Sequence, residues 1–126
     1  MELSIEKNAA LTLARLHLLS GKHQLQQGCL TAGLTALYDS VVFGMRYYIA
    51  KHECCAGFLE GTNLWDVIGL FQVLTRSGVF EDPLMLNRFS LMVERALWQQ
   101  SLSSDTNAII AEAEKMLVQL GVMPLD

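Results

Sequence analysis

The stretch Gly28–His52, GCLTAGLTALYDSVVFGMRYYIAKH, decides the fold of this chain. Its large apolar residues recur every three or four positions: Leu30, Leu34, Leu37, Val41, Met45 and Tyr48. This spacing puts one apolar stripe of an α-helix toward a core. A second row at helical spacing consists of small residues, which let another backbone come close: Gly33, Ala36, Ser40 and Gly44. The sequence therefore predicts a helix that is packed on more than one side, at the centre of a helical bundle.

A first helix is expected from an N-cap at Ser4 to about Gln27, with Gly28 as the left-handed residue that ends it. Gly21 lies inside this span, but the apolar pattern resumes at Leu25. One continuous helix is therefore predicted, at a cost of about 1 kcal/mol for the glycine. Two adjoining apolar faces are predicted on it: Ile5, Ala9, Leu13 and Leu16 on one, and Leu11, Ala14, Leu18 and Leu25 on the other.

Three more helices are predicted after residue 62. Their expected starts are Asn63 with Asp66 three residues later, Asp82-Pro83, and Ser104 or Asp105. Their core stripes are Leu64, Val67, Ile68, Phe71 and Leu74, then Leu86, Phe89, Val93 and Ala96, then Ile109, Ile110, Ala113, Met116, Leu117 and Leu120. The expected ends are Ser77-Gly78, the polar run 101–107, and Gly121 with Pro124. Since no window alternates long enough to predict a strand, the chain is expected to be one all-α domain, 1–126, a compact antiparallel bundle of about five helices.

Composition argues against several classes of protein. Hydrophobic residues make up 52% of the chain and charged residues 17%, which is unlike a disordered chain. The longest uncharged stretch, Gln24–Tyr38, is shorter than the roughly 20 apolar residues that cross a bilayer, so no membrane association is expected. The high hydrophobicity is interpreted as a well-filled core plus a surface for a homo-oligomer, with a dimer favoured.

The charge and the cysteine content are typical of a cytoplasmic protein and do not favour a nucleic-acid partner. The net charge is −4, and residues 58–126 carry nine acidic side chains against four basic ones, so a nucleic-acid partner is not favoured. The N-terminus carries Glu2 and Glu6, unlike a signal peptide. Cys29, Cys54 and Cys55 are an odd set without disulfide spacing, which favours reduced thiols in the cytoplasm.

The order of these features resembles that of HEPN (higher-eukaryote and prokaryote nucleotide-binding) domains, which are small helical bundles. The likeness is carried by LARLHLLSGKHQLQQG at 13–28, CLTAGLTALYDSVVFGMRYYIA at 29–50, RFSLMVERALWQQ at 88–100 and AIIAEAEKMLVQLG at 108–121. Active members of that family cleave RNA, often as dimers, and their signature is an arginine followed four to six residues later by a histidine. It usually lies near the end of the penultimate long helix.

In this chain the corresponding region holds Arg88 and Arg95, but the last histidine is His52. The resemblance therefore implies a member that lacks the signature, a non-catalytic domain that self-associates. Its implied ligand is a nucleotide or a partner protein, such as a small nucleotidyltransferase.

The arginines suggest a phosphate- or nucleotide-binding site. Asp39 and Arg46 are seven residues apart and share a face of the central helix, and Arg88 and Arg95 share a face in the same way. The planar guanidinium binds phosphate bidentately, so a groove between these helices is a candidate site. The alternative is a solvated polar stripe with an ion pair worth at most about 1 kcal/mol.

A second interpretation is a HEPN-type ribonuclease toxin that uses Arg46 and His52, because histidine supplies a base or acid near neutral pH and arginine a fixed cation. The two side chains lie about 120° apart on one helix. They converge only if the helix breaks near Lys51 or a second subunit completes the site. The alternative is a polar-face arginine and a histidine at a helix C-terminus. A third interpretation is a structural bundle subunit of a larger complex.

No cofactor or metal is expected. His52-Glu-Cys-Cys55 groups possible ligands, but adjacent cysteines do not have zinc-site spacing, and a second ligand pair is missing. Four aromatic residues that could stack bases are predicted to be core or dimer contacts instead: Tyr47, Tyr48, Trp65 and Trp98.

Overall fold

A computed structural model describes residues 2–52, 66–99 and 105–123 of the chain, with side chains from residue 8 onward in the first helix and from residue 106 in the last. These residues form five α-helices: α1 Glu2–Gln26, α2 Leu30–Lys51, α3 Val67–Arg76, α4 Met85–Gln99 and α5 Asp105–Gln119. The described ranges contain no strand. The prediction of an all-α bundle of five helices is confirmed.

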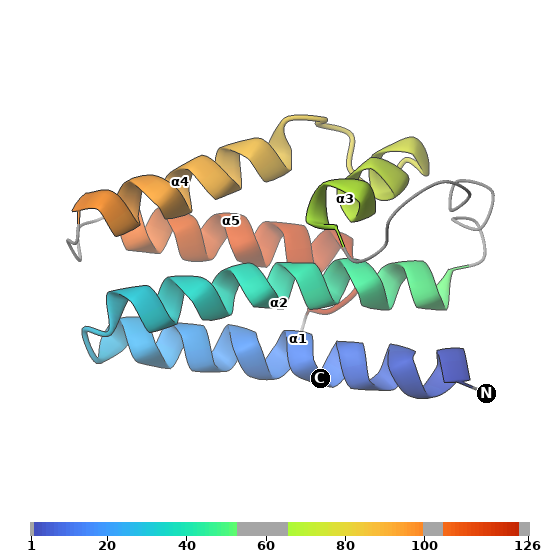
Figure 1. Cartoon of the computed structure of the whole chain (residues 1–126), viewed down its shortest axis with the longest axis horizontal. Coiled ribbons are helices and arrows are strands. Elements are labelled where there is room, and N and C mark those ends of the chain that lie inside the picture. Colours follow the sequence, from blue (N-terminus) through green and yellow to red (C-terminus); the bar gives the residue numbers. More distant parts are fainter. Residues whose placement is uncertain (1, 53–65, 100–104, 124–126) are drawn as a thin grey trace.

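Helix α2 is the central element of the bundle. It contacts each of the other four helices, and it lies antiparallel to α1 in Figure 1. Its predicted apolar stripe is buried from Leu30 to Met45, and Tyr48 is half-buried at the end of that stripe. Helices α4 and α5 run antiparallel to each other on the other side of α2 from α1 (Figure 1).

The predicted row of small residues is where α1 and α5 approach α2. A Cβ atom placed on Gly33 would lie 2.6 Å from Leu25 Cγ of α1, and one placed on Gly21 would lie 3.0 Å from the Gly33 carbonyl oxygen. Gly21 therefore sits inside α1 because α2 leaves no room there for a side chain. The buried Ser40 hydroxyl adds a bond across this contact, donating to the Ala14 carbonyl at 2.6 Å.

Three helices end on a glycine with positive φ: Gly28 after α1 at 83°, Gly78 after α3 at 81° and Gly121 after α5 at 77°. In each case the glycine N–H donates to the carbonyl three residues earlier, and the next N–H donates to the carbonyl five residues earlier. These two bonds define the Schellman motif, which needs a residue in the left-handed conformation. The ends predicted at these glycines are confirmed.

Three predicted helix starts are wrong or shifted. Helix α1 already includes Ser4, so Ser4 is not its N-cap. Helix α3 begins after Asp66, whose carboxylate accepts from the Ile68 N–H at 3.1 Å, while Asn63 lies outside the described residues. Asp82 accepts from the Leu84 N–H at 2.9 Å, but α4 begins at Met85. An aspartate bonds the N–H two residues on in turns as well as in helix caps, so residue type alone does not fix the boundary.

One of the two apolar faces predicted on α1 points outward. Leu13 and Leu16 are 37% and 56% exposed, whereas Ala14, Leu18 and Leu25 of the other face are buried. On α3 the predicted core residue Ile68 is 62% exposed. Each of these helices packs on the bundle along a single side, so its second apolar row is left uncovered. No helix in the described ranges has the length and apolar content needed to span a bilayer.

Candidate functional site

The polar stripe predicted on α2 lies at the surface. The predicted pair Asp39 and Arg46 is half-buried, and Thr31 and Thr35, which lie on the same face of α2, are exposed. The Arg46 guanidinium carbon lies 5.8 Å from the centre of the Phe43 ring, within the range of a cation–π contact. The same ring stacks on His17 of α1, with centroids 5.3 Å apart and planes 6° apart. Arg46 therefore borders a contact between α1 and α2.

Arg88 and Arg95 lie on the exposed side of α4. Arg88 pairs at 2.6 Å with Asp82, which lies three residues before the first residue of α4. The Leu84 N–H and the Arg88 side chain hold the pKa of the Asp82 carboxyl below its ordinary value, and the charge of Lys115 on α5 acts in the same direction. The Arg88 guanidinium is therefore already engaged by a carboxylate.

The predicted groove does not bring all three arginines together. The side of α4 that packs on the bundle is apolar, and there Phe89 stacks on Tyr38 of α2 with ring centroids 6.0 Å apart. Arg88 and Arg95 share one surface, but it faces away from this contact, whereas Arg46 belongs to α2. An aromatic contact between α2 and α4 therefore occupies the place where the predicted groove would lie.

Arg46 and His52 do not converge either. Helix α2 continues without a break to Lys51, and the His52 N–H donates to the Tyr48 carbonyl at 3.0 Å. The His52 ring stacks on Tyr48, with centroids 4.0 Å apart. Since α2 is unbroken, the roughly 120° of rotation between the two side chains is retained. The ribonuclease arrangement within one chain is not formed.

The remaining predicted sites bring few reactive side chains together within the described residues. Residues 53–55 of the His52-Glu-Cys-Cys55 cluster and Trp65 lie outside the described residues. Within the described ranges, His, Cys, Asp and Glu side chains form no group that could hold a metal ion. Cys29 is a free, exposed thiol just before α2.

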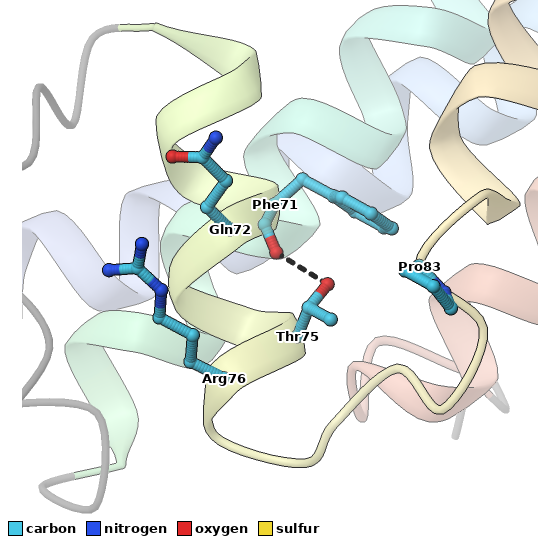
Figure 2. Close-up of a pocket in the computed structure, with 5 residues that line it drawn as sticks. All are labelled: Phe71, Gln72, Thr75, Arg76 and Pro83. Atoms are coloured by element: carbon cyan, nitrogen blue, oxygen red, sulfur yellow. Dashed lines mark hydrogen bonds between the residues drawn. The ribbon is translucent and has the colours of Figure 1, made fainter.

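A pocket of about 190 Å³ lies between α3 and the chain just before α4. It is lined by Phe71, Gln72, Thr75, Arg76 and Pro83. Figure 2 shows Phe71 and Thr75 on the side of Pro83, while the ends of Gln72 and Arg76 extend away from it. The Thr75 hydroxyl is used within the helix, because it donates to the Phe71 carbonyl at 2.8 Å. The pocket is therefore small and apolar, with its polar groups directed elsewhere.

The outer surface of α4 carries a feature that sequence reasoning missed. Leu84, Leu91 and Trp98 are 57%, 58% and 87% exposed. They are spaced by seven residues, and a helix drifts only about 20° over that interval, so they form one line, which we call the α4 outer stripe. The signal was present in the sequence as a second apolar row, out of phase with the core row of Leu86, Phe89, Val93 and Ala96. The core row alone was used to predict the helix.

Comparison with known proteins does not place the chain in a family. It matches no protein-family model, no curated protein and no solved structure. Function must therefore be inferred from the surface of the bundle itself.

Proposed function

We propose that this chain is a non-catalytic, HEPN-like interaction domain of the cytoplasm that self-associates and binds a partner protein. The observation that supports the proposal is the α4 outer stripe, three large apolar side chains in line and open to solvent. Aligned exposed apolar residues on a soluble bundle mark surfaces for association. The exposed free thiol of Cys29 fits a reducing compartment.

A protein partner fits this surface better than a nucleotide. Phosphate binding needs several unengaged donors that converge on one point. Arg88 is held by Asp82, and Arg46 lies on a different helix beside the Phe43 ring. By contrast, Leu91 and Trp98 offer apolar area that association would remove from water. A small nucleotidyltransferase is the partner class that the HEPN resemblance suggests.

The self-association part is tested by light scattering on the purified chain over a wide range of concentrations. The average mass is expected to rise with concentration, and Leu91→Glu should hold the protein at the monomer mass. Ile68→Glu is the matched control, because Ile68 is a helical apolar residue of similar exposure, 62% against 58%, and it lies on α3, away from the α4 outer stripe. A monomer at every concentration would contradict self-association.

The non-catalytic part is tested with labelled RNA. The wild-type protein is expected to leave the RNA intact, and the ribonuclease interpretation instead expects cleavage that His52→Ala abolishes. Cleavage that survives Arg95→Ala would overturn the non-catalytic proposal.

Adding ATP or GTP is expected to leave the melting temperature of the protein unchanged, whereas a bound partner protein raises it.

A further inference from the structure

We infer that the occupant of the α4 outer stripe is the same stripe of a second copy of this chain, and that the two α4 helices run parallel about a two-fold axis along their length. This inference rests on the self-association proposed above and specifies its geometry.

The stripe runs the length of α4 on the outside of the molecule. Leu84 immediately precedes the helix, Leu91 is near its middle and Trp98 is its penultimate residue. In Figure 1, α4 lies along one edge of the bundle, so its outer side is clear of the other described helices. A helix of this length spans about 22 Å. A second helix can therefore lie against the whole stripe.

The two flanks of the stripe carry different charges. Around the axis of α4, Arg95 is rotated from Leu91 by about 40° and Arg88 by about 60° in the same direction. Asn87 lies about 40° and Glu94 about 60° to the other side. One flank is therefore cationic, and the other holds an amide and a carboxylate. All four residues are exposed.

The relative direction of two copies decides which flanks meet. In a parallel pair about a two-fold axis along the helices, each cationic flank faces the opposite flank of the other copy. Arg95 then faces Glu94 of the second copy at nearly the same height, and this contact occurs twice. In an antiparallel pair centred on Leu91, each flank faces its own kind, so Arg95 faces Arg88, whose charge is already balanced by Asp82, and Glu94 faces Asn87. Charge complementarity therefore favours the parallel pair, which gains two Arg95–Glu94 contacts, over the antiparallel pair, which gains none.

The available area predicts a weak dimer. Trp98 is 87% exposed and offers roughly 200 Å² at most, and the two leucines add less. Two helices of this length bury less than the roughly 800 Å² per partner of a standard interface. We therefore expect a transient pair, with monomer and dimer exchanging as the protein is diluted.

Charge exchange at the flanks tests the direction of the pair. Dimerisation is measured by sedimentation equilibrium for the wild type, Arg95→Glu, Glu94→Lys and the double variant. In the parallel pair each single variant places two like charges opposite each other, so dimerisation weakens by roughly tenfold. The double variant exchanges the two charges and restores it to near the wild-type value. In the antiparallel pair Arg95→Glu faces the Arg88–Asp82 ion pair and Glu94→Lys faces Asn87, so the two single variants do not both weaken dimerisation, and that result would overturn the inference.

Cross-linking gives a second, independent measurement. In a background with Cys29, Cys54 and Cys55 changed to serine, Leu84→Cys is treated with a short bifunctional maleimide. The parallel pair yields a linked dimer from Leu84→Cys alone, whereas the antiparallel pair links only a mixture of Leu84→Cys and Trp98→Cys proteins. Thr12→Cys on the exposed side of α1 is the control that should not link.

The possible failures are distinguishable. A wild-type dimer that links only in the mixed sample overturns the parallel geometry and leaves the proposed self-association standing. A wild-type chain that stays monomeric at all concentrations overturns both.

Discussion

The close approach of α1 and α2 can be tested at Gly33, the tightest point of their contact. In Gly33→Ala the new Cβ would lie 2.6 Å from Leu25 Cγ and 3.1 Å from the Gly21 carbonyl oxygen, whereas ordinary contacts of a Cβ begin at 3.4 Å. Leu25 is only 7% exposed and its Cγ is not the flexible end of the side chain, so the helices must separate or Leu25 must leave its rotamer.

Two effects of opposite sign determine how far Gly33→Ala changes the free energy of unfolding. Overpacking of a filled core costs about 1–3 kcal/mol, and alanine in place of a helical glycine returns up to about 1 kcal/mol. We expect Gly33→Ala to lower the free energy of unfolding by about 1–2 kcal/mol. For a domain of this size this corresponds to a fall in melting temperature of about 4–8 °C. Urea denaturation followed by far-ultraviolet circular dichroism measures the free energy, and thermal melting measures the temperature.

Two comparisons isolate the steric part. Ala32→Gly changes the neighbouring, exposed position of α2 and measures helix propensity alone, with an expected loss of about 1 kcal/mol. In a Leu25→Ala background the two closest atoms, Leu25 Cγ and Cδ2, are gone and only the 3.1 Å approach to the Gly21 carbonyl oxygen remains, so Gly33→Ala should cost less than in the wild type, with a coupling energy of about 1 kcal/mol. If Gly33→Ala instead stabilises the wild type by as much as Ala32→Gly destabilises it, or if no coupling is found, the close approach is refuted.

Ser40, Gly78 and Asp82 each allow one contact or one backbone conformation to be tested. Ser40→Ala removes the buried hydroxyl bond to the Ala14 carbonyl, and chemical denaturation should show a loss of about 1 kcal/mol. Gly78→Ala should destabilise by about 1 kcal/mol through its φ of 81° alone, since no atom lies within 4 Å of the added Cβ, and Gly78→Asn should be milder. At Asp82 the test is the dependence of stability on pH. Because the pKa of Asp82 is lowered in the folded state, its ionised carboxylate stabilises the fold at pH values above 3.8, the ordinary pKa of this group. This stabilisation is lost as the pH falls through the lower pKa of the folded state. The difference in stability between the wild type and Asp82→Asn should therefore be constant near neutral pH and disappear in strong acid; a difference that grows in acid would contradict the assigned direction.

The sequence could predict the helices because their signals are local. The apolar stripe and the row of small residues in 28–52 identified α2 as a central helix, since a side chain every three or four positions faces one way in any α-helix. Gly28, Gly78 and Gly121 marked true helix ends, because the left-handed conformation that closes a helix favours glycine wherever it occurs. The all-α class and the number of helices followed from these signals.

The choice among faces and the grouping of arginines depended on tertiary packing. A helix with two apolar rows has no local property that says which row is covered, and so Leu16 was assigned to the core although it lies outside, while the α4 outer stripe passed unnoticed. Likewise, spacing showed that Arg88 and Arg95 share a face, but only the stacking of Phe89 on Tyr38 determined that this face turns away from α2. Periodicity fixes the angle between residues on one helix, whereas the rotation of each helix against its neighbours is set by which side chains fill the common core, and that is a property of the assembled bundle.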